Sequence, residues 1–167
     1  MRKYLYWLFP TIWMTVIFCF SSQPYEKQNI QPYLTSAIDL NFLEPYINWI
    51  TFTYHQSEVS VEGLGLYGFI EFFIRKGAHV FVFFILCCFF YFALKQTTTM
   101  KFTYQLVISF GLTFLYACFD EFHQSFTENR TAYIGDVFLD GFGGGLAILF
   151  LVVLFHVKSK GKRHIIE

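Results

Sequence analysis

The sequence predicts an all-α integral membrane protein, a bundle of four transmembrane helices with a long extracellular loop between the first two. Three observations support this class. Of the 167 residues, 55% are hydrophobic and only 14% are charged, whereas an ordinary soluble domain has roughly 25% charged residues. The apolar residues gather in four runs long enough to cross a bilayer. The remaining charges gather beside these runs.

The four apolar runs are the predicted spans, and they lie at about residues 4–20, 77–94, 102–119 and 137–157. At 1.5 Å per residue each run covers most of the roughly 30 Å hydrocarbon core. The chain from 1 to 167 is therefore predicted to form a single membrane domain.

The connection between the first two spans is broken by Pro24, Pro32 and Pro45. Residues 40–52 are apolar in patches, so we expect short helices that lie in the membrane interface. Residues 61–73 are amphipathic, and we expect them to continue into the second span as one helix.

Positive charges predict the orientation, because cytoplasmic loops are enriched in Lys and Arg. Arg2 and Lys3 precede the first span, Lys95 and Lys101 bracket the loop after the second, and a basic segment follows the fourth. The long connection is acidic and belongs outside. We therefore expect a multi-pass membrane protein with both termini cytoplasmic. A net charge of zero predicts no nucleic-acid partner.

Polar side chains gather at the outer ends of the predicted spans. They are Arg75, Lys76, His79, Asp120, Glu121, Gln124, Arg130, Asp136 and Asp140. Spacings of four residues place several of them on common helix faces. Ionisable groups at membrane depth usually face the bundle interior and pair, so we expect Arg75, Lys76 and Arg130 to neutralise the four acids.

These polar residues allow two interpretations, an ion-pair network that only fixes helix packing or a ligand site. If the protein is an enzyme, His79 with Asp120 or Asp136 would form an acid–base pair. The catalytic residues would then be His79, Asp120, Glu121 and Asp136. A metal site built from His79, Glu121, His123 and Asp136 has no recognisable ligand spacing, so we expect no metal and no other cofactor. The pair Gly141 and Gly145 has the GxxxG spacing of helix packing.

Four short motifs resemble those of the VanZ-like family, named for a bacterial teicoplanin-resistance protein. The motifs are Ser21-Ser22-Gln23-Pro24, Arg75-Lys76-Gly77-Ala78-His79, Asp120-Glu121-Phe122-His123-Gln124-Ser125-Phe126, and Arg130 followed by Asp136 and a glycine-rich helix. Their order and placement agree from about residue 5 to 155. One position departs from the family pattern, because Asp140 stands where Asn is usual.

The resemblance implies a protein of the bacterial cell membrane that lowers susceptibility to teicoplanin and related lipid-bearing glycopeptides. Besides membrane lipids, the expected partners are a lipid-linked cell-wall precursor or the antibiotic, held at the outer face by the nine polar residues named above. One alternative is an intramembrane hydrolase or transferase that acts on a lipid-linked substrate. Another is a small transporter or scaffold.

Overall fold

The computed structural model describes residues 2–127 and 133–163. This part of the chain contains four helices that are long and apolar enough to cross a membrane. The 3₁₀ helix η1 and the four long helices have the bounds η1 Arg2–Trp7, α1 Leu8–Ser21, α5 Val61–Thr97, α6 Phe102–Gln124 and α7 Ile134–Arg163. The predicted all-α membrane class is thereby confirmed at this level. Helices α5, α6 and α7 extend beyond the predicted limits of their spans, whereas the first predicted span consists of η1 continued by α1.

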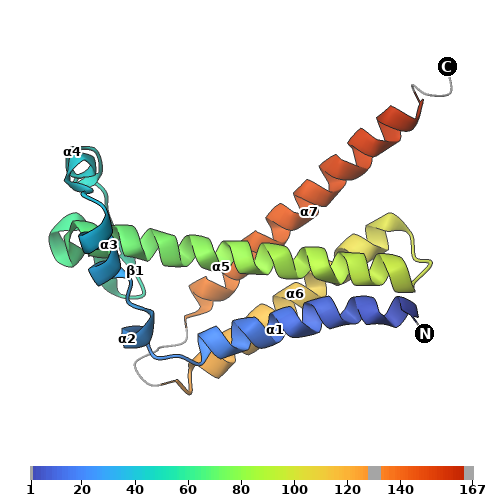
Figure 1. Cartoon of the computed structure of the whole chain (residues 1–167), viewed down its shortest axis with the longest axis horizontal. Helices are drawn as coiled ribbons and strands as arrows, with labels where there is room; N and C mark the ends of the chain where they lie inside the picture. Colours follow the sequence, from blue (N-terminus) through green and yellow to red (C-terminus); the bar gives the residue numbers. More distant parts are fainter. Residues whose placement is uncertain (1, 128–132, 164–167) are drawn as a thin grey trace.

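Helices α1 and α5 lie along one another, while α6 and α7 both cross α5 obliquely (Figure 1). The buried centre is formed by apolar side chains from all four helices: Ile17, Phe83, Leu86, Phe90, Ala117 and Val137. Large apolar side chains such as Leu115 and Leu149 point outward and are more than half exposed. An apolar outer surface around an apolar core is what a lipid environment requires.

Hydrogen bonds from an indole and a phenol group join α1 to α5 and α6. The Trp13 indole N–H donates to the carbonyl oxygen of Val82 on α5 over 2.9 Å, and the Tyr116 hydroxyl on α6 donates to the carbonyl oxygen of Met14 over 2.5 Å. Hydrogen bonds between helices fix the position of a helix within a membrane, where apolar side chains have no hydrophobic preference for one another over lipid.

The closest approach between α5 and α7 is at Gly143. A Cβ atom at this position would collide with the backbone carbonyl of Val80 on α5. Gly141 faces the ring of Phe114, whereas a Cβ at Gly145 would meet no atom within 4 Å apart from the backbone of its own helix. The expected GxxxG pair is therefore wrong in detail: Gly145 contributes nothing to this contact, and Gly143 permits it.

The connection between α1 and α5 contains short helices and one hairpin. The elements are α2 Tyr25–Gln28, α3 Gln31–Ala37, η2 Asn41–Leu43, α4 Glu44–Ile47, β1 Thr51–Tyr54 and β2 Ser57–Ser60. The antiparallel strands pair Thr51 with Ser60 and Tyr54 with Ser57. His55 and Gln56 at the turn both have positive φ, as a type I′ turn needs. The hairpin was not predicted, because Asn-Gly or Asp-Gly usually marks such a turn.

Helix α5 is longer than a membrane is thick. Its 37 residues correspond to about 55 Å, against roughly 30 Å of hydrocarbon. Residues 61–73 do join the second span, as expected, with one interruption at Gly65, where φ is 71° and ψ is 162°. The extra length carries the short helices and the hairpin at one end of the bundle (Figure 1).

We expect Gly143→Ala to destabilise the bundle, because the added methyl group must push α5 and α7 apart. Overpacking of this kind costs about 1–3 kcal/mol. Gly145→Ala is the matched control, since its methyl group meets no atom within 4 Å and Ala favours the helix. Thermal unfolding of the two purified variants in detergent checks this, and equal stability would contradict the assignment of the helix contact to Gly143.

Candidate ligand-binding site

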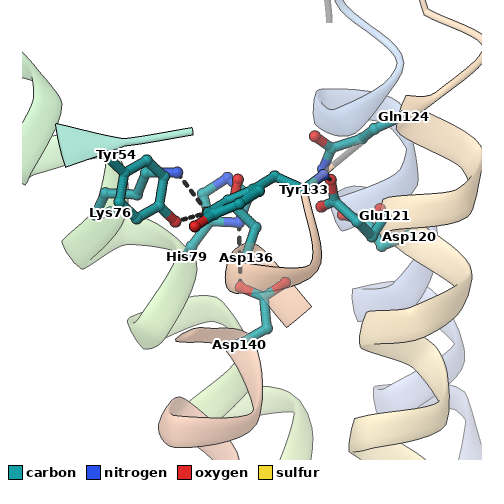
Figure 2. Close-up of polar contacts among 9 residues, drawn as sticks. All are labelled: Tyr54, Lys76, His79, Asp120, Glu121, Gln124, Tyr133, Asp136 and Asp140. Carbon is teal, nitrogen blue, oxygen red and sulfur yellow. Dashed lines mark hydrogen bonds and ion pairs between the residues drawn. The ribbon is translucent and has the colours of Figure 1, made fainter. Parts of the chain in front are cut away.

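Two polar contacts join α5 to α7 at the end of the bundle that carries the hairpin (Figure 2). Lys76 Nζ lies 2.5 Å from Asp136 Oδ1, and His79 Nδ1 lies 3.2 Å from Asp140 Oδ1. The residues of each helix are about one turn apart and share a face. Because Asp140 is 1% exposed and its ionised form only accepts hydrogen bonds, this pairing orients the imidazole with Nδ1 as donor.

Asp136 also connects the hairpin to the bundle. The Tyr54 hydroxyl on β1 donates to Asp136 Oδ1, and the Lys76 ammonium lies 4.4 Å from the centre of the Tyr54 ring, within the range of a cation–π contact. Burial first, and then the hydrogen bond to Asp136, raise the pKa of Tyr54 above its ordinary value. The phenol therefore stays protonated and remains a donor.

The two acids at the end of α6 are buried, and in each of them only one carboxylate oxygen accepts a hydrogen bond from the described residues. Gln124 Nε2 donates to Asp120 Oδ2 over 2.8 Å, and the backbone N–H of Tyr133 donates to Glu121 Oε1 over 2.5 Å. The other carboxylate oxygens, Asp120 Oδ1 and Glu121 Oε2, have no hydrogen-bond partner among the described residues. These two acids therefore keep acceptor capacity in a buried position.

Arg75 lies beside an acid that was not among the predicted site residues. Its Nη1 atom is 4.0 Å from Glu71 Oε1, and the same oxygen accepts from the backbone N–H of Ile30. Glu71 is 1% exposed. Glu71 precedes Arg75 by one helical turn. This spacing of four residues was the sequence pattern from which the pair could have been predicted.

A cavity of about 500 Å³ opens among α1, α5, α6 and the start of the connection. It is lined by Trp13, Val16, Ile17, Phe20, Ser21, Gln23, Lys27, Gln28, Ile30, Arg75, Ala78, His79, Val82 and Asp120. Its volume is in the range of small-molecule sites. Phe20 and Ala78 in its wall are exposed, so the cavity communicates with the outside of the bundle.

The cavity is polar at one end and apolar along its length. Ser21, Arg75, His79 and Asp120 lie at the polar end, and Trp13 lies at the apolar end with Val82. Along α1 the lining extends from Phe20 to Trp13, about 10 Å of helix. Such a cavity accommodates a molecule with a polar head and an apolar chain.

Several predicted pairings need correction. His79 contacts Asp140 and not Asp120 or Asp136. The close approach at Gly143 brings the turn of α7 that carries Asp140 beside His79. Of the expected cations, Lys76 does neutralise Asp136, whereas Arg75 lies beside Glu71. Arg130 lies outside the described residues. Within those residues no three His, Cys, Asp or Glu side chains are grouped as metal ligands.

Two further contacts could not be predicted from the sequence. Tyr54 reaches Asp136 only because it lies on an unpredicted hairpin that packs against α5. The backbone N–H of Tyr133 reaches Glu121 from the residue that precedes α7, a backbone contact with no side-chain pattern to reveal it.

The fold and the cavity define an all-α, multi-pass membrane protein with a charged site at one end of its helix bundle. The VanZ/LLP1 family model matches residues 6–156, nearly the whole chain. The chain therefore belongs to the VanZ/LLP1 family, and the resemblance seen in its motifs is confirmed. No curated protein matches the sequence, and no solved structure matches it either.

We expect Tyr54→Phe to loosen the hairpin, because it removes the phenol that donates to Asp136. A hydrogen bond to a charged group contributes about 1.5–3 kcal/mol, so amide hydrogen exchange across residues 51–60 should accelerate by about tenfold or more. Tyr46→Phe is the matched control, since the Tyr46 side chain is 72% exposed. Unchanged exchange in Tyr54→Phe would mean that other contacts hold the hairpin.

Proposed function

We propose that this VanZ/LLP1 protein acts at the outer face of the bacterial membrane and binds a lipid-linked molecule. The bound molecule is a lipid-linked cell-wall precursor or the lipid-bearing glycopeptide itself. Binding of either one is proposed to lower susceptibility to teicoplanin and related antibiotics, the role that the resemblance to the VanZ-like family implies. Family membership supports the membrane setting, and the cavity supports the kind of ligand.

The observation that carries the proposal is the amphipathic cavity. Lys27 and Arg75 provide positive charge at its polar end, where a phosphate or diphosphate head would lie. An Arg guanidinium suits such groups because it offers two parallel donors. The apolar wall from Phe20 to Trp13 would hold the first part of a lipid chain, which enters from the surrounding bilayer beside the exposed Phe20 and Ala78.

The proposed orientation rests on charge. The connection between α1 and α5 lies at one end of the bundle, and the turn from α5 to α6 lies at the other (Figure 1). The cavity is lined in part by the connection, through Gln23 and Lys27, whereas Lys95 and Lys101 belong to the end of α5 and the turn that follows it. The positive-inside rule then puts the cavity on the outer side. Both termini are cytoplasmic in this arrangement.

We expect Val16→Trp to abolish lipid binding and any teicoplanin resistance, because the larger side chain fills the apolar part of the cavity. Val153→Trp is the matched control, since Val153 lies on the outward face of α7 and is 52% exposed. Mass spectrometry of lipids that copurify with each variant measures binding, and teicoplanin susceptibility of expressing cells measures resistance.

The two measurements separate the parts of the proposal. Equal lipid content in Val16→Trp and the unaltered protein would rule out the cavity as the binding site. Lipid binding without any effect of the unaltered chain on susceptibility would rule out the resistance role alone.

Arg75→Ala should weaken binding of phosphate-bearing lipids by about tenfold or more, because it removes a charge-assisted contact.

One observation favours a second function, an acid–base enzyme that acts on the same lipid-linked substrate. His79 lines the cavity and its Nδ1 is oriented by the buried Asp140. A histidine held in this way by a carboxylate is the arrangement of a general base. In this alternative Asp140 replaces Asp120 and Asp136 as the partner of His79.

If the protein is an enzyme, His79→Gln should lower turnover by about 10²–10⁴-fold with little loss of substrate binding. His156→Gln is the matched control, because His156 is exposed near the far end of α7. Mass spectrometry of products from a lipid-linked substrate measures turnover. Absence of any product with the unaltered protein would reject the enzyme and leave the binding proposal intact.

A further inference from the structure

Two buried oxygen atoms in the cavity wall are unpaired. Asp120 Oδ1 and Ser21 Oγ make no hydrogen bond to any residue that the structure describes. Asp120 is 1% exposed and Ser21 is 6% exposed, and both side chains line the cavity. Folded proteins rarely leave buried polar atoms without a partner, so these two atoms point to a ligand that brings donors.

Asp120 also has no cationic partner within the described ranges of the chain. Lys76 pairs with Asp136, and His79 pairs with Asp140. The carboxylate of Asp120 receives a hydrogen bond from the neutral amide of Gln124. A buried carboxylate is costly unless a charge or several donors compensate it, and a positively charged group in the ligand would supply that compensation.

The same cavity carries positive charge from Lys27 and Arg75. These side chains would attract a phosphate. The polar end therefore presents separate complements to an anionic group and to a cationic group, within one cavity that continues into an apolar groove.

We infer that the cavity recognises a lipid whose headgroup carries both a phosphate and a primary ammonium. This inference rests on the proposed lipid-binding function and names the headgroup chemistry. The phosphate lies toward Arg75 and Lys27, and the ammonium lies toward Asp120 and Ser21. Three N–H donors of a primary ammonium can serve both unpaired oxygen atoms.

Related headgroups lack one part of this chemistry. A choline headgroup has the positive charge but no N–H donor, so it cannot hydrogen-bond to Asp120 or Ser21. A glycerol headgroup has hydroxyl donors but no positive charge. An ethanolamine phospholipid and a lipid-linked precursor with a free amine both have phosphate and ammonium, and they are the two sources of the shared chemistry.

The experiment is a competition on the full-length protein purified in detergent. Native mass spectrometry measures binding of dioleoyl phosphatidylethanolamine, phosphatidylglycerol and phosphatidylcholine added in equal amounts. We expect the ethanolamine lipid to bind about tenfold or more tightly, as the loss of one charge-assisted contact predicts. Equal binding of the choline or glycerol lipid would overturn the inference.

A variant then tests the residue. Asp120→Asn removes the charge but can keep the contact with Gln124, and it should reduce ethanolamine lipid binding to the level of the choline lipid. Asp39→Asn is the matched control, because Asp39 is exposed in the connection and does not line the cavity. Since the headgroup comparison uses the unaltered protein, a folding defect in Asp120→Asn cannot obscure it. An unchanged preference in a folded Asp120→Asn variant would overturn the inference.

A last comparison identifies the source of the amine and separates this inference from the proposed function. A lipid-linked precursor is added with its amine free or acetylated. Displacement of bound phosphatidylethanolamine by the free form alone supports the inference and identifies the precursor as the stronger ligand. Displacement by both forms overturns the ammonium requirement. If no lipid binds at all, the proposed function itself fails, whereas equal binding of every lipid contradicts only the headgroup inference.

Discussion

The backbones of α5 and α7 meet at Gly143, and the charged site depends on this contact. Without a side chain at this position, α7 lies directly against the Val80 carbonyl. The neighbouring residue His79 and the preceding turn of α7, which carries Asp140, are thereby brought within 3.2 Å. Lys76 and Asp136 follow one turn away. A larger residue at 143 would separate both pairs at once.

Two side-chain pairs, Lys76 with Asp136 and His79 with Asp140, join α5 to α7. They mark two parts of the polar end of the bundle. On one side, Asp136 is held by Lys76 and by Tyr54 of the hairpin, so this part is neutralised and structural. On the other side, His79, Arg75 and Asp120 border the cavity. The ion-pair network and the cavity proposed as a ligand site are therefore adjacent parts of one structure.

Hydropathy was sufficient to predict the four long helices, because twenty consecutive apolar residues have few other stable arrangements in a membrane. Helical spacing also predicted that Gln124 shares a helix face with Asp120, and in the structure the two side chains form a hydrogen bond. The choice of partner for His79 could not be predicted, since Asp120, Asp136 and Asp140 are equally reasonable until the depth of the α5–α7 contact is known. The hairpin escaped prediction because His55 and Gln56 are unusual residues for positive φ.

The exposed wall of the cavity would change how strongly the proposed lipid ligand must bind. A molecule that enters beside Phe20 and Ala78 can remain in the bilayer throughout, so it is never diluted into water. Confinement to a thin layer raises its effective concentration, in the same way that a tether does. A site with modest intrinsic affinity can then be fully occupied, and occupancy depends on the fraction of that lipid in the membrane leaflet.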